Sequence, residues 1–262
     1  MEKAIREAKV HTSWINPNDV YEQGLQSFIA AALADPAQSP FVRDALPFVR
    51  RIASYGLVNS LSQTLLKLSC PGVPDTYQGA ELWNFSLVDP DNRRPVDFAL
   101  RGRLLDELRG APCAERDLAA YVGELLTMRQ DGRIKLWLTH RALGFRTACP
   151  DLFDVRGGYV PLEAQGERAE NAIAFLRRSG ERAVLVVAPR LVTRLTKDGE
   201  PPLGDAWLDT FVEVKGELPG RRFRDVLTGA TMMLADRDGE AVLPLRAAFA
   251  TLPVAMLERL EG

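Results

Sequence analysis

The side chains best suited to chemistry gather in one short stretch of this sequence, between residues 77 and 94. Charged groups and aromatic rings follow one another there at close spacing, and they are Tyr77, Glu81, Trp83, Asp89, Asp91, Arg93 and Arg94. Carboxylates and guanidinium groups make bidentate hydrogen bonds that can fix hydroxyl groups. An amphipathic indole ring in a loop suits stacking on a sugar ring. The stretch is therefore a candidate binding site for a carbohydrate.

These residues also have purely structural interpretations. The two carboxylates and two arginines of residues 89–94 could equally form ion pairs that close the loop. An aromatic side chain such as Tyr77 on a buried strand is more often part of the core than of a binding site. Glu81 is expected to be structural, accepting backbone N–H groups and so holding the loop. The residue types alone leave the choice open.

A short strand is expected to position this stretch. Pro71, Gly72 and Pro74 end the preceding helix, and residues 73–78 are then long enough only for a short buried strand. The charged loop follows at the carboxyl end of that strand, which is where barrels and doubly wound folds bind ligands.

The same residues carry a family resemblance. Residues 71–81 follow the pattern P-G-x-P-x-x-Y-x-G-x-E, and this resembles the eighth-strand signature of the α-amylase superfamily, glycoside hydrolase family 13. Three further stretches resemble one branch of that family in particular, and they are residues 81–97, Arg6–Pro17 and Asn59–Lys67. The chain resembles a C-terminal portion of these longer proteins.

This resemblance implies a retaining intramolecular transglycosylation on maltodextrins. In that branch the reducing-end glucose is released from its α-1,4 bond and rejoined through an α,α-1,1 bond. A maltooligosaccharide or other α-glucan is the implied substrate, and no cofactor is needed, because retaining glycosyl transfer uses carboxylates. Two alternatives remain, a non-catalytic module that holds α-glucan and a remnant of an α-amylase-type hydrolase.

The catalytic carboxylates of the family are missing from this sequence. A retaining enzyme needs a nucleophile and an acid about 5 Å apart, and the family carries them in R-x-D, lone-Glu and T-H-D motifs on earlier strands. His11 is followed by Thr12 and His140 by Arg141, so neither histidine belongs to a T-H-D motif. We expect the chain to start just after the last catalytic motif, to be inactive alone and to need the missing N-terminal barrel half as a partner.

His11 is a further candidate for substrate contact, because it lies in a segment that closely follows the seventh strand in the resembled family. A lone histidine is, however, more often a structural residue.

An α+β, multidomain fold is expected. Residues 1–149 would be the C-terminal part of a (β/α)8 TIM barrel with extra helices, including the eighth strand and its loop. Apolar residues recur there at three- and four-residue steps, which predicts helices over 20–33, 41–52, 57–68, 98–108, 115–130 and 133–146.

Residues 150–262 would form a small antiparallel β-sandwich domain. Short apolar runs alternate there with Gly, Pro and Asp, which predicts strands over 159–162, 172–176, 183–187, 210–214, 222–226 and 241–245. Ser179-Gly180-Glu181 is expected to be a hairpin turn.

Composition excludes several other classes of protein. The formal net charge of the 262 residues is −2, so no electrostatic footprint for nucleic acid is present. No window reaches the roughly 20 apolar residues of a membrane span, and the amino end has no apolar signal-peptide core, so we expect a cytoplasmic protein without membrane contact. The three cysteines are widely spaced and only two histidines accompany them, which predicts neither a disulfide framework nor a metal site.

Overall fold

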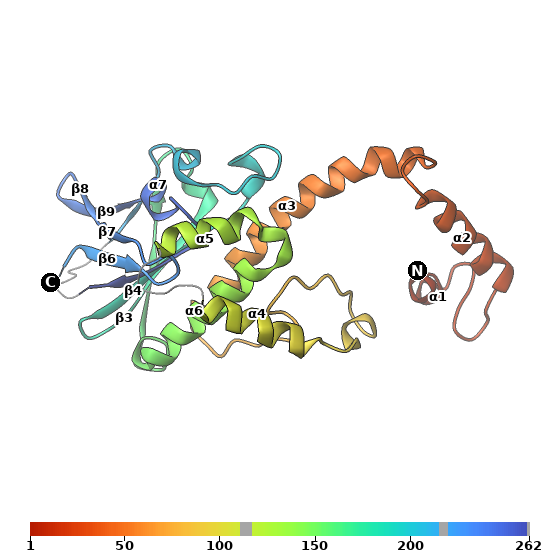
Figure 1. Ribbon diagram of the computed structural model, residues 1–262, viewed down its shortest axis with the longest axis horizontal. Coiled ribbons are helices and arrows are strands. Elements are labelled where there is room, and N and C mark those ends of the chain that lie inside the picture. The colour runs from red at the N-terminus through yellow and green to blue at the C-terminus, as the bar shows by residue number, and fades with distance from the viewer. Residues whose placement is uncertain (111–116, 215–219, 261–262) are drawn as a thin grey trace. The chain divides into compact units, whose positions relative to one another are not determined.

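The structure, a computed structural model, describes residues 1–110, 117–214 and 220–260. They form two compact units, residues 1–53 and 54–262 (Figure 1). None of the helices in these ranges combines the length and the apolar character that a membrane-spanning helix requires. Cys113 lies outside the described residues.

The first unit consists of α1 (Glu2–Ala8), α2 (Asp19–Ala32) and the beginning of α3 (Pro40–Ser69). The Asn18 side chain caps α2 by accepting the N–H of Tyr21 at 3.2 Å. Glu22 of α2 accepts hydrogen bonds from the Arg6 guanidinium at 2.6 Å and from the Thr12 hydroxyl at 2.5 Å. These bonds lower the pKa of Glu22 to about 2, so its carboxylate ties α2 to the preceding chain.

The predicted helix over 20–33 is confirmed, whereas the helices predicted over 41–52 and 57–68 form the single helix α3. The prediction of two separate helices was wrong, because the chain remains helical through Gly56 and Pro47 also lies within α3. From Leu57 onward, α3 belongs to the second unit and buries apolar side chains in it. This packing outweighs the unfavourable helix propensity of one glycine.

Three helices follow in the second unit, α4 (Phe98–Gly110), α5 (Leu118–Thr127) and α6 (Arg133–Ala148). They confirm the predictions over 98–108 and 133–146, and α5 confirms the helical centre of 115–130. Residues 115 and 116 lie outside the described residues. The Asp117 carboxylate caps α5 by accepting the N–H of Ala119 at 2.9 Å.

The strand predicted over 73–78 is wrong. These residues are irregular, with Val73 96% and Tyr77 50% exposed, so Tyr77 is not a core residue either. A strand is stable only where neighbouring strands satisfy its backbone groups, and no described strand pairs with this segment. In this structure residues 70–97, here called the loop segment, connect α3 to α4 without a strand.

Two antiparallel sheets make up the rest of the second unit. In spatial order the six-stranded sheet contains β1 (Gly158–Leu162), β3 (Ala172–Ser179), β4 (Arg182–Pro189), β10 (Ala255–Arg259), β6 (Arg222–Asp225) and β7 (Thr231–Met233). The four-stranded sheet contains β2 (Ala164–Gln165), β5 (Phe211–Glu213), β9 (Glu240–Pro244) and β8 (Ala235–Arg237). A short helix, α7 (Leu245–Ala248), follows β9.

The six predicted strands correspond to β1, β3, β4, β5, β6 and β9. The predicted hairpin is also confirmed, since Ser179 pairs with Arg182 and Gly180 has a φ of 57°. Four strands were missed. Three of them, β2, β7 and β8, have only two or three residues, too few for an alternating pattern to be recognised.

Alternate residues of β4 enter two different hydrophobic cores. Val184, Val186 and Ala188 belong to the core shared with α3, α5 and α6. Residues 183, 185 and 187 belong to the core that contains side chains of both sheets. Both faces of the six-stranded sheet are therefore covered, which explains why β4 is an uninterrupted apolar run.

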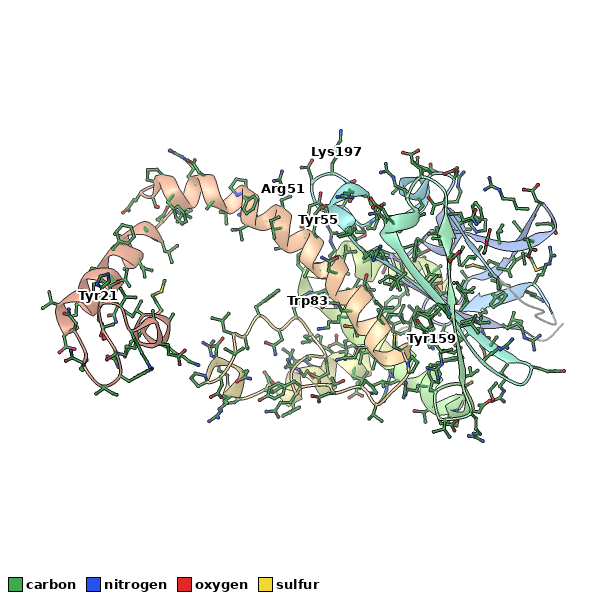
Figure 2. All side chains as sticks on the ribbon, turned by 180° about the vertical axis from the view of Figure 1, so that it is seen from behind. Tyr21, Arg51, Tyr55, Trp83, Tyr159 and Lys197 are labelled. Atoms are coloured by element: carbon green, nitrogen blue, oxygen red, sulfur yellow. The ribbon has the colours of Figure 1, made fainter. Side chains whose placement is uncertain are left out.

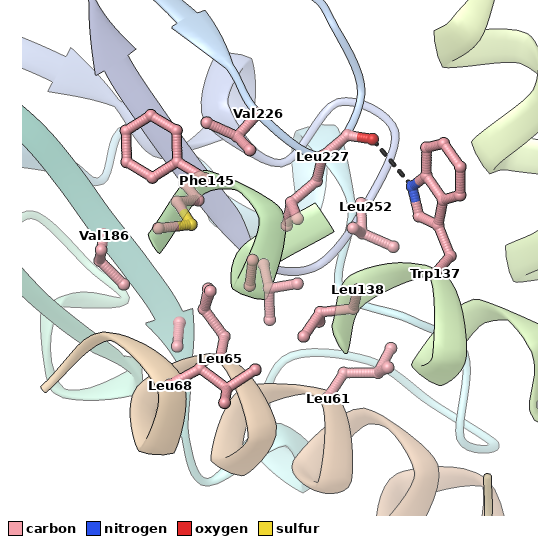
Figure 3. Close-up of a cluster of buried hydrophobic side chains, with 14 of the residues drawn as sticks. Leu61, Leu65, Leu68, Trp137, Leu138, Phe145, Val186, Val226, Leu227 and Leu252 are labelled. Atoms are coloured by element: carbon pink, nitrogen blue, oxygen red, sulfur yellow. Dashed lines mark hydrogen bonds between the residues drawn. The ribbon is translucent and has the colours of Figure 1, made fainter. Parts of the chain in front are cut away.

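The helix-facing core is fixed by one buried hydrogen bond as well as by packing. Trp137 of α6 is 1% exposed, and its indole N–H donates to the Leu227 carbonyl at 2.9 Å (Figure 3). Leu61, Leu65 and Leu138 pack in the same cluster (Figure 3). The helices thus share this core with the six-stranded sheet.

Asp225 is a buried carboxylate at the end of β6, only 2% exposed. Its Oδ1 accepts the N–H groups of Leu227 at 3.0 Å and Met256 at 3.3 Å, and its Oδ2 accepts the Thr228 hydroxyl at 2.8 Å. Burial raises the pKa of Asp225 from 3.8 to about 6, although these hydrogen bonds act in the opposite direction. The folded protein therefore holds this proton more tightly than the unfolded chain.

A pH dependence of stability follows from this shift. The contribution of Asp225 is fully present below pH 3.8 and is lost as the pH rises through about 6. We expect the free energy of unfolding to fall by roughly 3 kcal/mol over that window. Asp225→Asn should remove this component, because the amide does not titrate and its oxygen still accepts two of the three bonds. Urea unfolding of both proteins between pH 4 and 7 measures the difference, and parallel curves would contradict the assignment.

Candidate functional site

The loop segment encloses a cavity of about 380 Å³, here called the loop cavity. Three of the residues singled out in the sequence, Trp83, Asp91 and Arg94, line it. The remaining lining residues are Gln78, Gly79, Asn84, Phe85, Ser86, Asn92, Pro95, Val96, Asp97 and Arg101.

Trp83, labelled in Figure 2, belongs to the wall of the loop cavity. Its indole N–H donates to the Arg129 carbonyl at 2.7 Å. The Lys135 ammonium lies 5.6 Å from the centre of the Trp83 ring and donates to the Leu82 carbonyl at 3.2 Å. Burial lowers the pKa of Lys135. A ring fixed in this way offers a flat apolar surface at little entropic cost.

Two ion pairs close the turn of residues 89–94, Arg93 with Asp89 and Arg94 with Asp91. Asp91 also accepts the Leu87 N–H at 2.8 Å. The four charged side chains thus pair within the loop, which agrees with the interpretation that they form ion pairs closing it. Only the Arg94–Asp91 pair borders the cavity, and its guanidinium is 78% exposed, so this pair contributes little to stability and remains accessible to a ligand.

Asn92 completes this part of the wall. Its Oδ1 is buried and has no hydrogen-bond partner in the part of the chain that the structure describes. A buried amide oxygen without a donor is unfavourable by about 1–3 kcal/mol, so a hydroxyl group that enters the cavity and donates to it would be stabilised.

Glu81 holds the loop segment, but through a different partner from the one expected. Its Oε2 accepts the Arg101 Nε–H at 3.0 Å rather than backbone N–H groups. Arg101 also donates to the carbonyls of Gly79 at 2.9 Å and Asp97 at 3.0 Å. Asp97 in turn caps α4 by accepting the Leu100 N–H at 2.8 Å. This network joins both ends of the polar loop to α4.

Three predicted residues are not part of the cavity wall in the second unit. Tyr77, Asp89 and Arg93 belong to the loop segment but do not line the cavity. His11 belongs to the first unit, where it is exposed and its ring lies 5.0 Å from the Tyr21 ring.

Asn92, Asp97 and Arg101 also line the cavity and were not predicted as site residues. Asp97 was recognisable, because an Asp directly before the predicted helix over 98–108 is a capping signal. Asn92 and Arg101 gave no such signal.

The loop cavity is suited to recognising a neutral, hydroxyl-rich ligand. Amide groups, a serine hydroxyl, two arginines and two aromatic residues line the same space, and this combination forms directed hydrogen bonds around an apolar platform. Both of its carboxylates have structural partners, Asp91 in the turn and Asp97 at the helix start. Among the described residues, no three His, Cys, Asp or Glu side chains are grouped to hold a metal ion.

Comparison with known proteins confirms the resemblance inferred from the sequence. A Mycobacterium tuberculosis protein (strain H37Rv), provisionally named a maltooligosyl trehalose synthase, is 36% identical over 258 residues. The match covers 98% of this chain and 27% of that relative. No protein-family model matches the chain.

Solved structures give the same result. The maltooligosyltrehalose synthase of Arthrobacter ramosus is 35% identical with a TM-score of 0.74, over 98% of this chain and 29% of that one. A further maltooligosyl trehalose synthase is 27% identical with a TM-score of 0.68, over 99% and 29% respectively. The chain therefore shares its helices and antiparallel sheets with these synthases, and it spans less than a third of their length.

Proposed function

We propose that this chain is the C-terminal portion of a maltooligosyl trehalose synthase. The substrate would be a maltooligosaccharide, whose reducing-end α-1,4 linkage is converted to an α,α-1,1 linkage by retaining intramolecular transglycosylation in trehalose biosynthesis. The observation that carries this proposal is the 36% identity over 98% of the chain. The nucleophile and acid that such chemistry needs would come from residues outside this sequence.

We also propose how this chain fits into the fold of the longer synthase. Residues 1–149 would complete a (β/α)8 barrel and add helices to it, and residues 150–262 would be a β-sandwich, in keeping with a core that contains side chains of both sheets. The missing N-terminal barrel half would be the partner. Residues 73–78 would become the eighth strand beside it, because the neighbouring strands would then satisfy their backbone groups. A cytoplasmic location belongs to the same proposal.

Within the loop cavity we assign glucan contacts to Trp83, Asp91, Arg94 and Asn92. The Trp83 ring would stack on a glucose ring, and Asn92 would accept a hydroxyl hydrogen. Arg94 would donate to sugar oxygens, with Asp91 orienting its guanidinium. His11 and Tyr77 lie outside the cavity and receive no contact in this assignment.

Arg94 and Arg93 offer a matched test of this assignment. They are adjacent, both are paired within the same turn, and only Arg94 lines the cavity. Arg94→Ala should weaken maltopentaose binding about five- to tenfold, the effect of losing a hydrogen bond from a charged donor. Arg93→Ala should change it less than about twofold, because it removes a similar exposed ion pair outside the wall. Isothermal titration calorimetry with maltopentaose measures both.

Cellopentaose, whose linkages are β-1,4, is the control ligand and should not bind. Equal effects of the two variants would refute the assignment of Arg94. Absence of maltopentaose binding by the unmodified chain would refute the glucan site in the loop cavity.

A further inference from the structure

A second and larger cavity, of about 610 Å³, is lined in part by the first residues of the loop segment and is here called the arginine cavity. Its apolar wall includes Pro71, Val73, Pro150 and Phe153, and its cationic groups are Arg146 and Arg177. It shares no lining residue with the loop cavity. Its volume lies in the range of about 300–1,000 Å³ that is typical of small-molecule sites, and its mostly apolar lining with few polar groups is also typical.

Arg177 is the unusual residue of this cavity, because it is a charged side chain that is 1% exposed and only partly hydrogen-bonded. It lies on β3, two residues after the buried Phe175, so its side chain is on the same face of the strand. One Nη atom donates to the Gly157 carbonyl at 3.3 Å. Its Nε and its other Nη have no hydrogen-bond partner within residues 1–110, 117–214 and 220–260. A buried guanidinium without an anion is strongly unfavourable.

None of the residues that the structure describes supplies that anion to Arg177. Arg146 approaches the same aromatic ring, and the two guanidinium carbons lie 5.0 Å (Arg146) and 5.8 Å (Arg177) from the centre of Phe153. Burial and then the charge of Arg146 lower the pKa of Arg177. The carboxylate in the wall, Asp154, pairs with Arg156 at 2.5 Å. Among the described residues that line this cavity, two side chains are thus positively charged and the one carboxylate is already paired.

We propose that the arginine cavity binds a small organic anion. Its carboxylate or phosphate group would engage Arg177 and Arg146, since planar guanidinium groups match oxyanions in geometry as well as in charge. The apolar body of the ligand would pack against Phe153 and the prolines of the wall. The site is independent of the glucan site proposed above, because the ligand differs in charge and the two cavities have no residue in common.

The test uses inorganic phosphate and phenyl phosphate as probes, with sodium chloride at equal ionic strength as the reference. Both phosphates should shift the amide NMR signals of Phe153 and Gly157 in a saturable manner, and sodium chloride should not. Phenyl phosphate should bind more tightly than inorganic phosphate, because its ring buries apolar surface. Absence of a saturable shift with phosphate would overturn the proposal, and equal affinities would overturn the part that assigns the apolar wall.

Arg178 provides the matched control, since it is the next residue of β3, is exposed and lies on the opposite face of the strand. Arg177→Gln should weaken phosphate binding at least about tenfold, and Arg178→Gln should leave it within about twofold. Unchanged affinity in Arg177→Gln refutes the site. If the spectrum of that variant shows an unfolded protein, Arg146→Gln takes its place, with the same expected loss and the same refuting outcome.

Discussion

Alanine in place of Leu138 is expected to lower the free energy of unfolding of the second unit by about 3 kcal/mol. Leu138 is fully buried on α6 in the core shared by helices and sheet. The substitution removes apolar atoms from that core and leaves a cavity whose walls can only partly relax. Urea unfolding followed by tryptophan fluorescence measures the change, which should appear in the midpoint rather than in the slope.

Leu143 on the same helix provides a matched control. It is 42% exposed, and Leu143→Ala makes the same chemical change with the same difference in helix propensity. Its expected effect is below about 1 kcal/mol, because much of this side chain is already in contact with water. Equal losses in the two variants would mean that α6 does not pack as described.

Maltopentaose incubated with this chain alone is expected to keep its reducing ends. Retaining transglycosylation needs a nucleophile and an acid. In the 262 residues no T-H-D motif occurs and no Arg-x-Asp closes an apolar strand run, since Arg129-Gln130-Asp131 lies in a turn between two helices. The two carboxylates of the loop cavity do not replace the nucleophile and the acid, since Asp91 holds the turn and Asp97 caps α4. A reducing-end assay at neutral pH checks this, with the Arthrobacter ramosus synthase as the positive control.

The two ways in which this expectation could fail have different meanings. Loss of reducing ends without hydrolysis would show that the chain contains a complete synthase site. A gain of reducing ends would show hydrolysis and favour the α-amylase-type alternative.

Local sequence patterns predicted those elements whose stability is determined nearby. The Gly180 hairpin and the helices over 98–108 and 133–146 depend on turn chemistry and on apolar periodicity, both visible in the sequence. The strand over 73–78 has suitable residues but no partner in this structure, so its prediction failed. The central strand β10 was missed because its buried run Ala255, Met256 and Leu257 shows no alternation and is much shorter than the apolar run of β4, which was predicted.

The candidate site, like the fold, was predicted only in part. Trp83, Asp91 and Arg94 are recognisable by type and by close spacing, and they do line one cavity. The pairing of Glu81 with Arg101 joins residues 20 positions apart, and it depends on the path of the loop segment between them. No local pattern specifies that path, so the partner of Glu81 had to come from the structure.

The hydrogen bond from Trp137 to the Leu227 carbonyl also limits which recombinants between related proteins can keep this core. The indole of a helix and the backbone of a turn between two strands meet in one core, although 90 residues separate them. Recombination between related genes near the helix-to-strand transition would combine a helix from one parent with a turn from the other. Such a chimera retains the bond only when both parents place the indole and the carbonyl alike.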